Sequence, residues 1–169
     1  MLCSAADHTS GPSRRFCRAA KLTPLSTLVY RSKATIPLTE LELLYLLGQA
    51  RGRNQAEMIT GLLVYDRGLF YQWIEGSDQS MGKLWQSIRQ DPRHREIEIL
   101  SEQQIPIRLF RDWHMQLAFR EGYWGSAIDG LVQAPNDVLD QLHQQPQRAP
   151  VILAEFTALG GGPFSRAFR

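Results

Sequence analysis

Cysteine is scarce in this chain of 169 residues, and long hydrophobic runs are absent from it. Its two cysteines, Cys3 and Cys17, both lie near the N-terminus and lack the spacing of metal ligands. We therefore expect neither a disulfide framework nor a metal site, and the composition favours the reducing cytoplasm. No segment approaches the roughly 20 consecutive apolar residues of a membrane-spanning helix, so we expect no membrane partner.

Excess basic charge is also lacking from most of the chain. Residues 1–27 carry four basic side chains against Asp7, a net charge of +3, so the other 142 residues sum to −1 of the total of +2. A nucleic-acid-binding body usually has a clustered basic face, and we therefore expect no nucleic-acid partner. The basic start lacks the apolar stretch of a secretory signal. Its composition also fits a transit peptide, but we interpret residues 1–25 as a disordered extension or a mis-assigned start.

The apolar residues that are present suffice for one packed core, because hydrophobic content is 43% and includes four tryptophans. Apolar and polar residues alternate in five segments, as they do in half-buried strands. The predicted strands are 25–33, 59–65, 69–75, 96–104 and 112–119. Helical periodicity follows Thr39, which has capping-box spacing to Glu42. A second helix is predicted to begin at Ser77 and Asp78 and to end before Pro92.

The order of these elements, β-α-β-β-α-β-β, matches the split βαβ pattern of ferredoxin-like folds. We expect an α+β fold whose mixed sheet carries both helices on one face. Weaker helical patterns follow at 135–145 and 150–159. A sheet with helices on one side needs cover on the other, so we expect the C-terminal helices to supply it. The predicted divisions are a domain at 26–120, a helical cap at 121–160 and a mobile tail at 161–169.

Several polar side chains fall on faces that these patterns predict to be buried. They are Tyr30, Ser32, Asn54 and Gln72. Gln72 is the clearest case, since strand alternation places it between Phe70 and Ile74 on one face. Burying an unpaired amide or hydroxyl costs on the order of 2 kcal/mol. Any one of these residues can find a backbone partner in a core, but together they indicate a polar object shared by the helices and the sheet.

The chemistry of this set suits a flat heterocycle. Asparagine and glutamine each offer N–H donors and a carbonyl acceptor, and tyrosine adds a hydroxyl. Basic residues lie near the predicted helix ends, where an anionic tail could reach solvent: Arg51, Arg53, Arg93 and His94. Arginine matches phosphate geometry, although exposed arginines are usually plain surface residues.

Four motifs carry these residues: LVYRSKA at 28–34, ARGRNQAEMITGLLVYDRGLFYQWIEG at 50–76, DPRHREIEIL at 91–100 and RLFRDWHM at 108–115. Over about residues 26–119 the chain resembles the BLUF family of blue-light sensors, which use flavin adenine dinucleotide (FAD). The resemblance implies that FAD is bound noncovalently between the two helices and the sheet.

The resemblance also implies roles for individual residues. Tyr30 would be the light-reactive tyrosine and Gln72 the switching glutamine, while Asn54 would bind the pyrimidine edge of the flavin. Ser32 would also contact the cofactor. Arg53 replaces the Asn or His that other members often carry.

Two further pairs match the family. Arg93 and His94 match its frequent Arg-His pair after the second helix. Trp113 and Met115 match the pair on the last strand that takes the signal outward. Simple core filling is the alternative for this second pair, and we prefer it for Leu117 and Phe119 on the same face.

The family mechanism implies that light drives an electron and a proton away from Tyr30, and that Gln72 ends rotated or tautomerised. The sequence leaves both alternatives open. The roughly 50 residues after position 120 are too few for a cyclase or diguanylate phosphodiesterase domain. We therefore expect a stand-alone sensor rather than an enzyme, which signals to a separate effector protein and forms a homo-oligomer.

Two other functions are consistent with parts of the pattern. A small flavin-dependent oxidoreductase would need a second donor site, and no nicotinamide-type glycine fingerprint occurs. The second is a pigment-free ferredoxin-like interaction or RNA-binding module, but the aromatic RNP-type strand motif is absent and residues 28–169 carry a net charge of −1.

Overall fold

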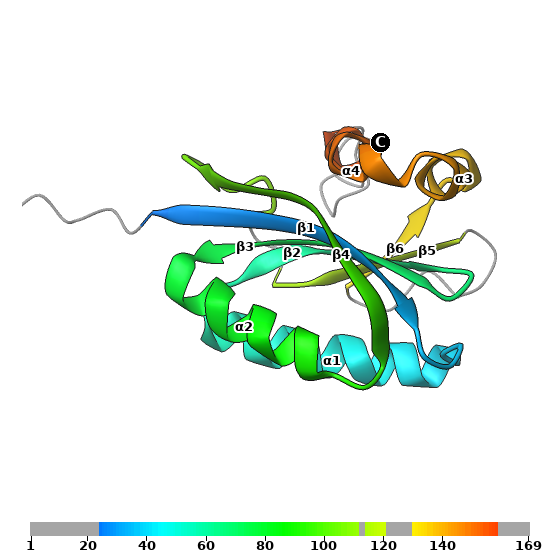
Figure 1. Ribbon diagram of the computed structural model, residues 1–169, viewed down its shortest axis with the longest axis horizontal. Coiled ribbons are helices and arrows are strands. Elements are labelled where there is room, and N and C mark those ends of the chain that lie inside the picture. Colours follow the sequence, from blue (N-terminus) through cyan, green and yellow to red (C-terminus); the bar gives the residue numbers. More distant parts are fainter. Residues whose placement is uncertain (1–23, 112–113, 121–129, 159–169) are drawn as a thin grey trace, which may run out of the picture.

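The computed structural model describes residues 24–111, 114–120 and 130–158. Its strands are β1 (Leu25–Ala34), β2 (Thr60–Asp66), β3 (Leu69–Ser77), β4 (His94–Ile105), β5 (Gln116–Arg120) and β6 (Leu131–Ala134). Its helices are α1 (Glu40–Ala56), α2 (Asp78–Gln90), α3 (Asn136–Gln144) and α4 (Ala149–Ala158), with a short 3₁₀ turn at Pro146–Arg148 before α4. Figure 1 shows the sheet as a central layer, with α1 and α2 on one side and α3 and α4 on the other.

The strands form one mixed sheet in the order β4-β1-β3-β2-β5-β6. β1 pairs antiparallel with β3 and β4, and β2 pairs antiparallel with β3. These four strands and the two crossing helices form the predicted ferredoxin-like α+β arrangement, which is confirmed. β5 and β6 extend the sheet through parallel pairings. β6 was not predicted, because its four residues carry too little alternation to be recognised.

Local sequence signals explain the ends of the elements that frame the site. Thr39 caps α1 in the predicted capping box with Glu42, which satisfies backbone donors that the first helical turn leaves free. Ser77 caps α2 by accepting a hydrogen bond from the backbone N–H of Ser80. In the β2–β3 connection, Arg67 and Gly68 both have positive φ, 49° and 77°, as a type I′ hairpin turn requires.

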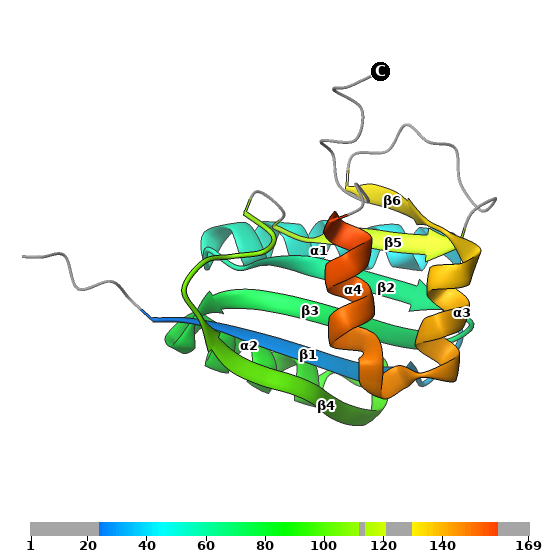
Figure 2. The same cartoon turned by 90° about the horizontal axis from the view of Figure 1, so that it is seen from above.

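The sheet separates two hydrophobic cores. The first lies under α1 and α2 and includes Leu28, Phe70 and Ile74. The second lies under α3 and α4 and includes Trp73 and Leu153. Figure 2 shows α3 and α4 lying across this second face of the sheet. The expectation that C-terminal helices cover the free face is therefore confirmed.

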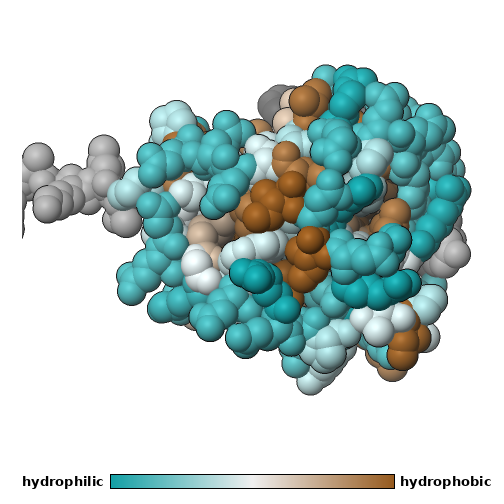
Figure 3. All heavy atoms as spheres, viewed as in Figure 1, coloured by the Kyte–Doolittle hydropathy of each residue, from teal (hydrophilic) through white to brown (hydrophobic). Residues whose placement is uncertain are grey.

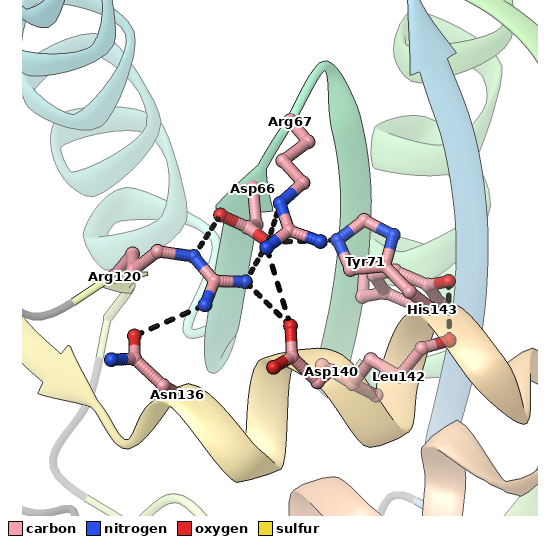
Figure 4. Close-up of polar contacts among 8 residues, drawn as sticks. All are labelled: Asp66, Arg67, Tyr71, Arg120, Asn136, Asp140, Leu142 and His143. Atoms are coloured by element: carbon pink, nitrogen blue, oxygen red, sulfur yellow. Dashed lines mark hydrogen bonds and ion pairs between the residues drawn. The ribbon is translucent and has the colours of Figure 1, made fainter.

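A polar network also fastens α3 to the β2–β3 turn (Figure 4). The buried carboxylate of Asp66 accepts hydrogen bonds from Arg120 at 3.1 and 2.7 Å, and Nε2 of His143 lies 2.7 Å from its Oδ2. Arg120 also donates to Asp140 at 3.0 Å. Burial acts to raise the pKa of Asp66, but the hydrogen bonds and charges of Arg120 and His143 outweigh it and hold the pKa below its ordinary value.

The predicted strand at 112–119 is wrong at its start. β5 begins at Gln116, opposite Leu62 of β2, while His114 lies in a bend and Met115 precedes the strand. Alternation persists beyond the ladder, since Met115 and Leu117 both join the core under α1 and α2. The pattern therefore identified the face correctly but could not show where the neighbouring strand stops offering hydrogen bonds.

Some expectations concern other parts of the chain. Trp113, residues 1–23 of the predicted extension at 1–25, and the tail at 161–169 lie outside the described residues, while Leu25 already begins β1. In the part that the structure describes, no helix has the length and apolar character needed to cross a bilayer.

Candidate functional site

Tyr30 and Gln72 form a buried pair at the centre of the sheet. The register of β1 and β3 places them directly opposite each other, so their side chains are neighbours on the face under α1 and α2. The Tyr30 hydroxyl donates a hydrogen bond to Oε1 of Gln72. Tyr30 is 0% exposed and Gln72 is 8% exposed. The amide between two apolar residues is therefore buried and has a phenol as its partner.

The other end of the Gln72 amide faces sulfur. Its Nε2 lies 3.5 Å from Sδ of Met115, which is also buried. A thioether is a weak acceptor, so this contact holds the amide less firmly than the phenol does. The two ends of one amide therefore contact a residue within β1, Tyr30, and a residue just before β5, Met115.

The environment of Tyr30 keeps it protonated. Burial raises the pKa of its phenol far above the ordinary range, and the charge of Asp91 raises it further, while the charge of Arg53 opposes both. The ring packs edge-on against Trp85 of α2, with centroids 5.2 Å apart. The phenol is therefore neutral, and its hydroxyl donates to Gln72.

Asn54 carries the clearest sign of a missing partner. It lies in the last turn of α1 and is 0% exposed. Among the described residues, neither Nδ2 nor Oδ1 has a hydrogen-bond partner. Burying both ends of an amide without partners costs several kcal/mol. The side chain is thus suited to a ligand edge that offers one acceptor and one donor, as the pyrimidine edge of a flavin does.

A cavity of about 310 Å³ lies between α1, α2 and the sheet. Its lining includes predicted site residues from three segments: Arg53, Gln72, Arg93 and His94. Its volume lies at the lower end of the range for small-molecule sites. An outer hollow of about 700 Å³ shares Arg53, Ser87, Asp91 and Arg93 with it. The inner part suits a ring, and the outer part has the basic groups that suit an anionic tail.

Arg93 is held in place at the junction of these hollows. Its Nε and Nη2 donate to the Asp91 carboxylate at 2.9 and 2.6 Å, and its backbone N–H donates to the same group at 2.9 Å. Arg93 also borders a third, apolar hollow beside Leu41 and Tyr45. Figure 3 shows a hydrophobic patch at the lower right, where the start of α1 lies in Figure 1. The guanidinium therefore stands between a polar and an apolar surface.

His94 and Ser32 form a second contact across the site. His94 Nδ1 lies 2.8 Å from Oγ of Ser32, and the ring packs against Phe70 with centroids 4.7 Å apart. Burial lowers the pKa of His94, although the charge of Asp91 opposes this. The imidazole is therefore favoured in its neutral form and can exchange donor and acceptor roles with the serine.

Arg53 bridges the two helices at the outer hollow, because its Nη1 donates to Oγ of Ser87 at 3.2 Å. Sequence reasoning missed Ser87 and interpreted Asp91 only as a helix terminator. The Asp-Pro-Arg spacing was the available signal for the Asp91–Arg93 pair. The structure thus brings together every predicted cofactor-binding residue except Asn54 through contacts or shared cavity walls, and Asn54 directly follows Arg53 on α1.

Fold and site together define a ferredoxin-like ligand-binding domain with a phenol–amide pair in its core. Residues 25–116 match the family model BLUF, described as sensors of blue-light using FAD. The match covers more than half of the chain, and the chain therefore belongs to the BLUF family of flavin-based blue-light sensors.

Individual relatives agree with this assignment. A photoactivated adenylate cyclase subunit beta of Euglena gracilis is 36% identical over 100 residues, which cover 59% of this chain and 12% of that protein. The dark-state structure of BlrB, a BLUF protein, has a TM-score of 0.66 at 27% identity and covers 82% of this chain and 96% of that one.

A third relative is Klebsiella pneumoniae BlrP1, solved with FMN and cyclic diGMP, with a TM-score of 0.55 at 27% identity; the match covers 81% of this chain and 35% of that one. The match spans only about an eighth of the length of the curated cyclase subunit.

Proposed function

We propose that this chain binds FAD noncovalently in the cavity between α1 and α2, and that Tyr30 and Gln72 form its light-responsive hydrogen-bond switch. The single observation that supports this most strongly is the chain of contacts from Tyr30 through Gln72 to Met115. The unpartnered amide of Asn54 supports a polar ring as the ligand. The family description favours FAD, while BlrP1 was solved with FMN.

Each polar group has a place in this proposal. Asn54 and Gln72 hold the polar edge of the ring, and Ser32 with His94 lines the adjacent wall. Arg53 and Arg93 face the outer hollow, where the phosphates of the cofactor need positive charge. Arg53 differs from the Asn or His that is frequent in the family, and its contact with Ser87 provides a bridge between the helices that those shorter side chains would not.

When bound, the flavin supplies blue-light absorption and an excited state that accepts an electron. We assign Tyr30 as the electron donor. Its neutral phenol would lose its proton together with the electron, because a phenol cation in this buried site would cost too much free energy. The proton has one acceptor within hydrogen-bond distance on this side, Oε1 of Gln72. Gln72 would accept this proton at Oε1 and release one from Nε2 toward the cofactor. When the electron and a proton return to Tyr30, Gln72 would be left either in its imidic form or as an amide rotated so that Oε1 and Nε2 have exchanged positions.

Both outcomes change what Met115 contacts. Rotation places an oxygen against the thioether sulfur, and so the N–H···S contact is lost. The imidic form leaves an N–H or a bare nitrogen there instead. Trp113, which lies outside the described residues, remains the second proposed relay residue. The switch therefore changes one local network without turning over a substrate.

The test is an absorption spectrum of the purified flavoprotein before and after blue light. We expect a small, reversible red shift in the wild type and none in Gln72→Leu, which removes both amide contacts. Release of the cofactor by heat and its chromatographic identification distinguishes FAD from FMN. A normal photocycle in Gln72→Leu would refute the assigned role. Steady consumption of a reduced nicotinamide would instead favour a flavin-dependent oxidoreductase.

We also propose that the chain is a sensor without output catalysis of its own, acts in the cytoplasm as a homo-oligomer, and passes its signal to a separate effector protein. The described C-terminal residues support a sensor without output catalysis, because α3 and α4 cover the second face of the sheet. Light scattering in the dark and under blue light measures the oligomeric state. A monomer under both conditions would contradict the homo-oligomer.

A further inference from the structure

The segment that leads from β4 to Met115 is fastened to β3 by a buried carboxylate. Glu75 is 0% exposed and lies three residues after Gln72, on the opposite face of the sheet. Its Oε1 accepts from the backbone N–H of Leu109 at 3.1 Å, and its Oε2 accepts from that of Phe110 at 3.1 Å. Oε1 also accepts from the indole N–H of Trp73 at 2.9 Å. One carboxylate therefore gathers donors from a strand and from the connection that follows β4.

Arg108 adds a second set of bonds from the same connection. Its Nη1 donates to the backbone carbonyl of Glu75 at 2.7 Å and to Oγ1 of Thr60 at 2.9 Å. Its Nη2 donates to the backbone carbonyl of Met58 at 2.7 Å. Residues 108–110 are thus bound to the end of β3 and the start of β2. We call these residues, together with Glu75, the clamp.

Burying a carboxylate costs free energy unless hydrogen-bond donors surround it. Apolar residues of similar volume often give a protein the same stability without that cost. Burial raises the pKa of Glu75, against the effects of the two backbone N–H groups, the indole and the charge of Arg108. Phe110 is also buried, and its ring meets that of Trp73 edge-on at 5.8 Å. The partners of the carboxylate at Trp73, Leu109 and Phe110 are all donors, so it holds this backbone segment in one position.

That segment ends at the switch. Met115 lies five residues after Phe110, and its sulfur contacts Nε2 of Gln72. Pairing of β5 with β2 begins only at Gln116. On the N-terminal side of Met115, Nδ1 of His114 lies 3.4 Å from the backbone carbonyl of Ile59. The clamp adds a second hold on that side at residues 108–110, and it binds them to the same strand that carries Gln72.

We infer that Glu75, with Arg108, is a positioning residue that sets the contact between Met115 and Gln72. This inference rests on the proposed role of Gln72 as the switch. Weakening the clamp would let Met115 move away from the amide. Without that contact, the Gln72 amide would return to its dark arrangement faster.

The test uses Glu75→Gln in the flavin-loaded full chain. Glutamine has almost the same size, but its NH₂ group would face a backbone N–H donor. Glu98→Gln on β4 makes the same exchange at a half-buried carboxylate and is the control, since Glu98 contacts Arg31 and Gln147 and no residue of the clamp. The first readout is the NMR signal of the Met115 methyl group in the dark, assigned with Met115→Leu. The second is the rate of dark recovery after blue light.

We expect Glu75→Gln to shift the Met115 signal and to speed recovery by about fivefold, the factor that one net hydrogen bond represents. The control should change neither. If Glu75→Gln does not fold, Arg108→Lys removes the forked contacts, keeps the charge and is judged by the same two readouts. A wild-type value for either readout in a folded variant overturns the inference. A wild type without any light-induced red shift would refute the proposed function instead, and the Met115 signal in the dark would still decide whether the clamp sets its position.

Discussion

Replacing Asn54 with leucine should have opposite effects on the flavin-free and flavin-bound protein. In the structure, both polar atoms of this amide are buried without a partner among the described residues. Leucine has a similar shape and needs no hydrogen bond. The flavin-free variant should therefore be more stable than the wild type, whereas its affinity for flavin should fall.

The size of each effect follows from the two atoms. An unsatisfied buried polar group costs about 1–3 kcal/mol, so relief at both atoms should raise the free energy of unfolding of the flavin-free protein by about 2–6 kcal/mol. In the proposed bound state, the flavin makes hydrogen bonds to both atoms. Their loss should weaken flavin binding by roughly tenfold to a hundredfold.

Urea unfolding of the flavin-free protein and fluorescence titration with FAD measure the two quantities. Gln55→Leu is the matched control, because it makes the same kind of exchange on an exposed position of the same helical turn. It should leave both quantities near their wild-type values. A flavin-free Asn54→Leu protein that is less stable than the wild type would show that the amide has a partner within the fold. Unchanged FAD affinity would remove Asn54 from the binding site.

Three further outcomes follow from the geometry. Tyr30→Phe should keep bound flavin but lose the light-induced red shift in absorption spectra, because Oε1 of Gln72 loses its donor. The stability that Asp66 contributes is present above its unfolded pKa, near 3.8, and is lost as pH falls through its lower folded pKa. Urea unfolding from pH 5 to pH 3 should therefore show a steeper loss in the wild type than in Asp66→Asn, which weakens the contacts with Arg120 and His143. Leu153→Ala should cost about 2–5 kcal/mol in the same assay, because this fully buried α4 residue packs in the second core, and a smaller loss would mean that α4 is loosely docked.

Strand alternation predicted the central pair of the site because it depends only on neighbouring residues. Tyr30 and Gln72 were assigned to buried faces from the side chains on either side of them, and the register then placed them together. Asn54 followed in the same way from the helical stripe of α1. Such periodic signals are local, and this makes them readable from one sequence.

Contacts between distant segments could not be predicted in this way. Glu75 lies on the opposite strand face from Gln72, and only the fold shows that α4 and the β4–β5 connection cover that face. Arg93 and Asp91 are only two residues apart, but their pairing depends on how the chain turns after α2. β5 began later than alternation suggested, because a strand ends where its neighbour stops pairing.

The two faces of the sheet differ in what a change at Gln72 would disturb. Toward α1 and α2 the core is interrupted by polar groups whose partners can be exchanged. Toward α3 and α4 the core is largely apolar apart from the buried carboxylate of Glu75, and Asp66 ties one end of it to Arg120. Tyr71, the neighbour of Gln72 on β3, points to this second face. Its hydroxyl donates a hydrogen bond to the backbone carbonyl of Leu142 in α3 at 2.8 Å. Adjacent residues of one strand point to opposite faces of the sheet. A shift of β3 at position 72 would therefore change the length of this bond to α3 or of the clamp contacts at Glu75.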